Sequence, residues 1–173
     1  LGLRTSAHIE STEGVEVGLK AGVDTIEHGA PLTDELLKLF KKNGLGNASS
    51  LTCTLSPALP FAVLSPEKTH STHVQKVNGR VVYEGVATAT RQALANGIPV
   101  GLGTDSACPF VTHYDMWREV VYFQRHTGVT PEFALHTATL KNAQLLGVAN
   151  ETGSLETGKS ADLIVLDANP LDD

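Results

Sequence analysis

Short apolar stretches alternate with longer amphipathic stretches along most of the chain. The apolar stretches predict strands at residues 3–8, 25–27, 48–55, 98–105 and 161–167. Helices of about 10–15 residues are expected between most of these strands, and this alternation is typical of βαβ units with a parallel sheet. We therefore expect an α/β fold.

Capping residues predict where the helices begin and end. Ser11 is suited to cap a helix that stops at Gly22, and Thr33 is suited to cap a helix that stops before Gly44. The same signals predict three further helices, over residues 81–96, 115–126 and 130–146. Residues 56–80 are rich in Pro, Ser, Thr and His, and we expect a long loop there, which in a compact domain is typically functional or poorly ordered.

The composition narrows the class of protein. The 173 residues, 41% hydrophobic and 18% charged, are enough for one ordinary globular domain with a core. A formal charge of −6 argues against a nucleic-acid or membrane-surface partner, and no apolar run approaches the roughly 18 residues of a membrane span. Cys53 and Cys108 show no pattern of a disulfide framework or a cysteine zinc site, so we expect a reducing, cytoplasmic setting.

Three polar residues follow predicted strands at equivalent positions. His8 ends the first strand, His28 ends the second one βα unit later, and Asp105 ends the apolar strand over residues 98–105. The carboxyl ends of strands in a parallel α/β barrel share one mouth, and two imidazoles with a carboxylate are suited to zinc. The competing interpretation is that each histidine is a loop residue with a single hydrogen bond, and the spacing alone leaves both open.

Four stretches together resemble the amidohydrolase superfamily, in particular its imidazolonepropionase-like branch, which includes Xaa-Pro dipeptidases. They read AHIESTEGVEVGLKAGVDTIEHG, GIPVGLGTDS, ATLKNAQLLGV and GSLETGKSADLIVLDANPL. The resemblance covers nearly the whole chain apart from the predicted loop. It implies the C-terminal half of a TIM-type (β/α)8 barrel, strands five to eight, over residues 1–150. Residues 151–173 would return to a small β-sandwich and contribute a strand to it.

The resemblance also implies roles for the three polar residues. His8 and His28 match the metal-binding histidines after strands five and six, and Asp105 matches the aspartate after strand eight. In the family that aspartate binds metal and acts as the general base while metal-activated water attacks the carbonyl of an amide, peptide or cyclic amide. The implied cofactor is one or two divalent metal ions, with zinc as the expected metal. The implied partner is a small amide or dipeptide-like substrate.

Two family features are missing from the sequence. The His-x-His pair after strand one and the bridging lysine or glutamate after strand four would both lie upstream of Leu1. The chain also opens without an initiating Met, so we expect a piece of a longer polypeptide that is inactive by itself and holds little metal. The alternative is a non-catalytic half-barrel that serves only as an association unit, and we expect a homo-oligomer, because an open half-barrel exposes sheet edges.

Other residues carry weaker signals. His70 and His73 in the predicted loop, and His113 after the last barrel strand, are candidates for substrate binding. The competing interpretation is that all three are solvated loop histidines. Aromatic residues of the 115–126 helix are expected to pack it against the sheet: Trp117, Tyr122 and Phe123.

Overall fold

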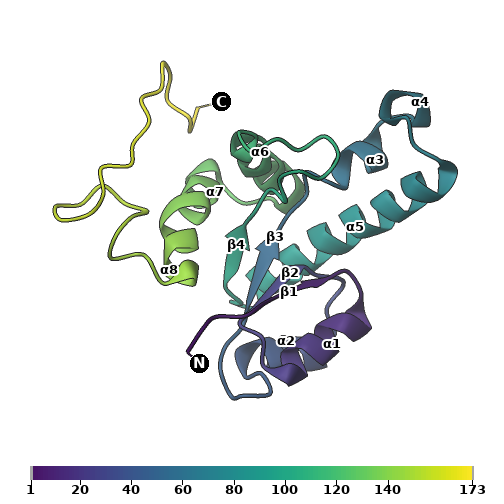
Figure 1. Ribbon diagram of the computed structural model, residues 1–173, viewed down its shortest axis with the longest axis horizontal. Coiled ribbons are helices and arrows are strands. Elements are labelled where there is room, and N and C mark those ends of the chain that lie inside the picture. The colour runs from purple at the N-terminus through teal and green to yellow at the C-terminus, as the bar shows by residue number, and fades with distance from the viewer. Residues whose placement is uncertain (1, 173) are drawn as a thin grey trace.

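A four-stranded parallel sheet forms the centre of the protein, whose computed structural model describes residues 2–172 (Figure 1). The strands are β1 (Ser6–Ile9), β2 (Thr25–His28), β3 (Ser50–Cys53) and β4 (Val100–Leu102). They lie side by side in the order in which they occur in the chain. The prediction of an α/β fold with a parallel sheet is confirmed.

The two faces of this sheet differ in chemistry. Ile26, Leu51 and Val100 are aligned in register on neighbouring strands, and all three are buried in the core. The next register positions carry Glu27 and Thr52, which are half-buried. Because side chains alternate along a strand, one face is apolar and the other is polar.

Helices cover the apolar face, and both ends of α1 follow the predicted caps. The main ones are α1 (Thr12–Ala21), α2 (Asp34–Lys41), α5 (His73–Ala95) and α6 (Met116–Thr127). The Ser11 hydroxyl accepts a hydrogen bond from the Gly14 amide at the start of α1, and Gly22 ends that helix with a φ of 86°. This left-handed conformation favours glycine, which explains the signal in the sequence.

The prediction of a loop over residues 56–80 is wrong. Two short helices, α3 (Leu59–Val63) and α4 (Pro66–Thr69), lie in this stretch, and α5 already begins at His73. Two of the three prolines that suggested a loop, Pro60 and Pro66, stand in the first turns of α3 and α4, where a missing amide is tolerated. Thr72 opens α5 with a capping box, so the polar residues begin helices here instead of interrupting them.

The helical segment predicted over residues 130–146 forms, with a π-helical centre. It comprises α7 (Pro131–His136), η1 (Thr137–Lys141) and α8 (Asn142–Leu146). The Asn142 side chain accepts a hydrogen bond from the Leu102 amide and donates one to the Leu102 carbonyl, both at 2.9 Å. One side chain therefore pairs with the backbone of β4 at the edge of the sheet.

The strand predicted over residues 161–167 does not form. Leu163, Ile164 and Val165 are 59%, 82% and 89% exposed, and the segment runs away from the sheet (Figure 1). A strand needs a neighbour for its backbone hydrogen bonds, and no strand lies beside this segment within residues 2–172. The apolar pattern is therefore present without the pairing that would make it a strand.

Candidate metal centre

His8 and His28 meet at the carboxyl ends of two adjacent strands. Their ring centroids lie 4.8 Å apart, with the ring planes at 78°. In the register of β1 and β2, however, His8 faces Glu27, and Ile9 faces His28. Regular alternation would place His28 on the opposite face of the sheet from Glu27 and His8. The left-handed backbone at His28, with a φ of 67°, breaks this alternation and accompanies the approach of its ring to His8.

A positive φ at a non-glycine residue costs free energy and is often retained at functional sites. At His28 the following residue secures it, because the Gly29 amide donates to the carbonyls of Ile9 and Glu27, both at 2.9 Å. The His28 side chain is 7% exposed. Burial lowers the pKa of His28, and the adjacent His8 lowers it further, against the opposing charges of nearby carboxylates. The neutral imidazole, which is the form that binds metals, is thereby favoured.

Glu10 joins the two histidines, and the motif-based reasoning overlooked it. One ligand atom from each of His8, Glu10 and His28 lies within 4.8 Å of the others, and we call these three residues the His–Glu–His cluster. Glu10 stands two positions after His8 and directly follows β1, so its side chain leaves the chain next to the strand end that carries His8. The signal in the sequence is therefore a His-x-Glu at a strand end, one βα unit before a second histidine.

Asp105 lies in the loop that follows β4 and outside the ligand set of the cluster. It is exposed, its backbone has a φ of 54°, and its Oδ2 accepts a hydrogen bond from the Cys108 thiol at 2.9 Å. This hydrogen bond, with burial and the Asp105 charge, raises the pKa of Cys108 to about 11. The Asp105 charge also acts on His28, raising its pKa against the effect of burial. Asp105 is thus electrostatically coupled to the cluster.

The three candidate substrate-binding histidines lie outside the cluster. His70 ends α4 with a φ of 49°, and His73 is the first residue of α5; both are exposed. His113 is exposed in the loop before α6, with its ring edge-on to Tyr114 at 4.8 Å. These positions bring none of the three into the set of convergent ligand atoms.

A second carboxylate that the sequence reasoning missed, Glu119 of α6, is fully buried. It accepts hydrogen bonds from the Leu55 amide at 2.7 Å, the Ser56 amide at 2.9 Å and the Ser56 hydroxyl at 2.5 Å. Burial raises the pKa of Glu119 to about 7, although these donors oppose the shift. The signal in the sequence is that Glu119 lies three positions after Met116 and four before Phe123, on the face of α6 that packs inward.

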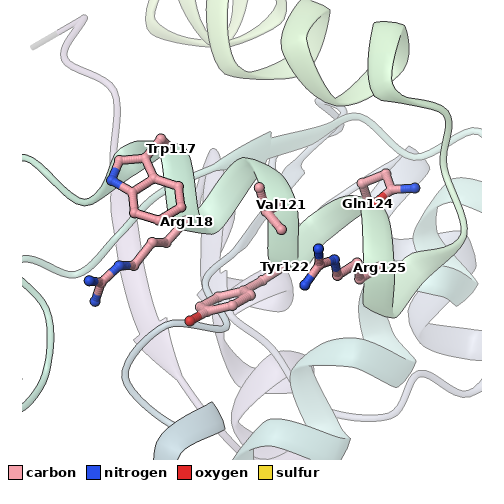
Figure 2. Close-up of a pocket in the computed structure, with 6 residues that line it drawn as sticks. All are labelled: Trp117, Arg118, Val121, Tyr122, Gln124 and Arg125. Atoms are coloured by element: carbon pink, nitrogen blue, oxygen red, sulfur yellow. The ribbon is translucent and has the colours of Figure 1, made fainter. Parts of the chain in front are cut away.

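A shallow hollow of about 480 Å³ lies along α6. Figure 2 shows its lining, which comes from one helix: Trp117, Arg118, Val121, Tyr122, Gln124 and Arg125. The Arg118 guanidinium lies 5.2 Å from the Trp117 ring, and Trp117 is 60% exposed. The prediction that Trp117 packs α6 against the sheet is therefore wrong, whereas Phe123 is fully buried as predicted. The hollow contains none of the candidate metal or substrate residues.

Comparisons with known proteins agree on one family. The sequence model of the amidohydrolase family matches residues 1–173. A candidate prolidase from Bifidobacterium longum is 48% identical, with a TM-score of 0.94, over 99% of this chain and 43% of its own. A Xaa-Pro dipeptidase solved with methionine in its active site is 30% identical, with a TM-score of 0.81, over 99% of this chain and 41% of its own. The imidazolonepropionase of Streptococcus sanguinis is 27% identical over 95% of this chain and 33% of its own length.

The chain is much shorter than the proteins to which it was compared. The chain spans about a third to about two fifths of the length of these three proteins.

Proposed function

Because the chain belongs to the amidohydrolase family, we propose that the protein to which it contributes hydrolyses a C–N bond in a small amide, dipeptide-like or cyclic amide substrate. The observation that carries this proposal is the convergence of His8 and His28 at the ends of two adjacent parallel strands. The solved neighbours described as prolidase and Xaa-Pro dipeptidase support the peptidase side of this range. The imidazolonepropionase relative is the reason to include cyclic amides among the proposed substrates.

The proposed architecture is one half of a (β/α)8 barrel over residues 1–150, followed by residues 151–173 as a return to a β-sandwich. Four parallel strands in chain order, with an apolar face under helices and a polar opposite face, support the barrel part. In a complete barrel the polar face would line the interior, and the strand ends would open into the active site. The unpaired apolar segment over residues 161–167 supports the sandwich part, because it has the pattern of a strand that lacks a neighbour.

The chemistry of the cluster fits a divalent metal. Imidazole nitrogens and carboxylate oxygens are the zinc donors of catalytic sites, and no side chain of the cluster forms a hydrogen bond within residues 2–172 that would occupy its donor atoms. In the proposed mechanism His8 and His28 hold the ion. When bound, such an ion polarises the substrate carbonyl and activates water for attack.

Asp105 is the proposed general base. Its carboxylate would accept the proton of the attacking water and return it to the departing nitrogen. Metal ligation by Asp105, and substrate contacts by His70, His73 and His113, stay predictions. A zinc cofactor, a homo-oligomeric assembly and a cytoplasmic location also stay predictions. Within residues 2–172, no helix combines the length and the apolar character that crossing a membrane requires.

The test uses the longest reading frame that encodes these residues. We expect that protein to cleave Xaa-Pro dipeptides, and we expect His28→Ala to lose activity together with most of one equivalent of bound divalent metal. His136→Ala, which alters the last residue of α7, is the matched control and should change neither. Unchanged metal content in His28→Ala would contradict the assignment. A well-folded protein without metal or activity would instead favour the non-catalytic half-barrel.

A further inference from the structure

The Glu10 carboxylate is placed like a metal ligand, although the family motif gives position 10 no such role. We propose that Glu10 is the third ligand of a divalent-cation site with His8 and His28, so that residues 1–173 alone bind one ion of the Zn²⁺ or Co²⁺ class. This inference rests on the proposed function only in that His8 and His28 hold the ion.

Geometry is the first support. His8 lies in β1, Glu10 directly follows this strand, His28 ends the adjacent β2, and their three ligand atoms lie within 4.8 Å of one another. Two imidazoles and one carboxylate make up the donor set of known catalytic zinc sites, which keep a further position open for water or substrate. The expectation that this chain holds little metal counted only two imidazoles and Asp105, and it did not include Glu10.

The local structure gives Glu10 no other task. It precedes α1, where a carboxylate can cap the helix, yet the Ser11 hydroxyl already receives the hydrogen bond from the Gly14 amide. Within the described residues the Glu10 side chain forms no hydrogen bond and no ion pair, and Lys20 of the following helix α1 pairs with Glu16 instead.

The experiment titrates the chain of residues 1–173 with Zn²⁺ alone by calorimetry and with Co²⁺ alone by visible absorption. We expect one site, and we expect Glu10→Gln to raise the Zn²⁺ dissociation constant at least about tenfold, the lower end of the effect of losing an outer-shell partner. The intensity of the Co²⁺ bands should change as well, because it depends on the number and type of ligands. Glu13→Gln, an exposed glutamate of the first turn of α1, is the matched control and should leave both readouts unchanged.

A second variant tests ligation directly. Glu10→Cys should add a thiolate-to-cadmium absorption band on addition of Cd²⁺, beyond any band of the unmodified chain, and Glu13→Cys should not. An unchanged Zn²⁺ affinity in Glu10→Gln, with no added band in Glu10→Cys, would overturn the role of Glu10. If His28→Ala still loses metal in that case, the proposed function survives and only this inference fails; if His28→Ala also keeps its metal, both fail.

Discussion

Glu10 and Glu119 are the same residue type in opposite environments. Glu10 is exposed at a strand end and forms no hydrogen bond within residues 2–172, whereas Glu119 is fully buried and accepts three. An exposed carboxylate pays little for desolvation and remains available to a cation, but a buried one must be satisfied by its surroundings. The pair therefore separates a carboxylate that can bind a ligand from one that holds the fold together.

The satisfied carboxylate also has a place in the architecture. Through Leu55 and Ser56, Glu119 connects α6 to the segment that leaves β3. In the sheet, β3 lies between β2, which ends in His28, and β4, which leads to Asp105. A structural carboxylate thus fixes the segment between two strands that carry the candidate chemistry.

Replacing each glutamate by alanine should produce the largest difference between the two residues, in the free energy of unfolding. Glu119→Ala leaves three buried donors without an acceptor, so we expect the free energy of unfolding to fall by at least about 3 kcal/mol. Glu10→Ala removes an exposed side chain and should change the free energy of unfolding by less than about 0.5 kcal/mol. Urea denaturation of both variants measures the difference, and equal losses would contradict the assignment of the two roles.

The second largest effect should be on the pH dependence of stability, which Glu119 contributes to the unmodified chain. The pKa of Glu119 is raised by burial to about 7 from an ordinary value of 4.5, so the folded state binds this proton more tightly than the unfolded state. Its stabilising contribution is complete below pH 4.5 and is lost as the pH rises to 7, by roughly 1 to 3 kcal/mol. Denaturation curves between pH 4.5 and 7.5 should show this slope in the unmodified chain. In Glu119→Gln the slope should be missing, and a slope that persists there would assign it to another group.

Metal should stabilise the chain through Glu10 and not through Glu119. At a Zn²⁺ concentration ten times the dissociation constant, mass action adds about 1.4 kcal/mol to the free energy of unfolding. Glu119→Gln should keep this increment in full. Glu10→Gln, with a dissociation constant tenfold higher, should retain only about 0.4 kcal/mol at the same concentration. Thermal denaturation with and without Zn²⁺ measures these increments, and identical increments in both variants would remove the distinction.

The smallest expected effect concerns Asp105, whose carboxylate accepts a hydrogen bond from the Cys108 thiol. Asp105→Asn removes the charge and weakens the hydrogen bond that raise the Cys108 pKa to about 11, so this pKa should fall. Alkylation of Cys108 by iodoacetamide at pH 8 should then accelerate, by roughly tenfold for each pKa unit lost. Asp34→Asn at the start of α2 is the control. An unchanged rate in Asp105→Asn would show that Asp105 is not bonded to the thiol in solution.

Local signals were predictable wherever a residue acts on its own neighbours. Ser11 and Gly22 bound α1 because capping needs only the adjacent backbone, and the alternation of apolar positions predicted the four strands that form. The same reasoning failed over residues 56–80, because a proline can either end a helix or occupy its first turn. It also failed over residues 161–167, because strand formation depends on a neighbour that the local pattern does not specify.

In the candidate site, too, local features were predictable and long-range contacts were not. The motifs pointed to His8 and His28 as residues at successive strand ends, and the structure brings the two rings to 4.8 Å. Glu10 required the strand direction and the register as well as the motif, and Glu119 required the packing of α6 against a segment more than sixty residues earlier in the chain. Such long-range partners leave only a faint local trace, in this case one charged residue on an inward helix face.

The sequence by itself determined the alternation of strands and helices, both ends of α1, the amidohydrolase family and the two histidines at the strand ends. These features depend on side-chain periodicity, backbone caps and motifs that are written locally. Only the tertiary structure decided that the left-handed backbone of His28 accompanies the meeting of its ring with His8, that Glu10 completes the convergent donors, and that Asp105 is bonded to Cys108. Each of these depends on distances between segments that come together only when the sheet has formed its register.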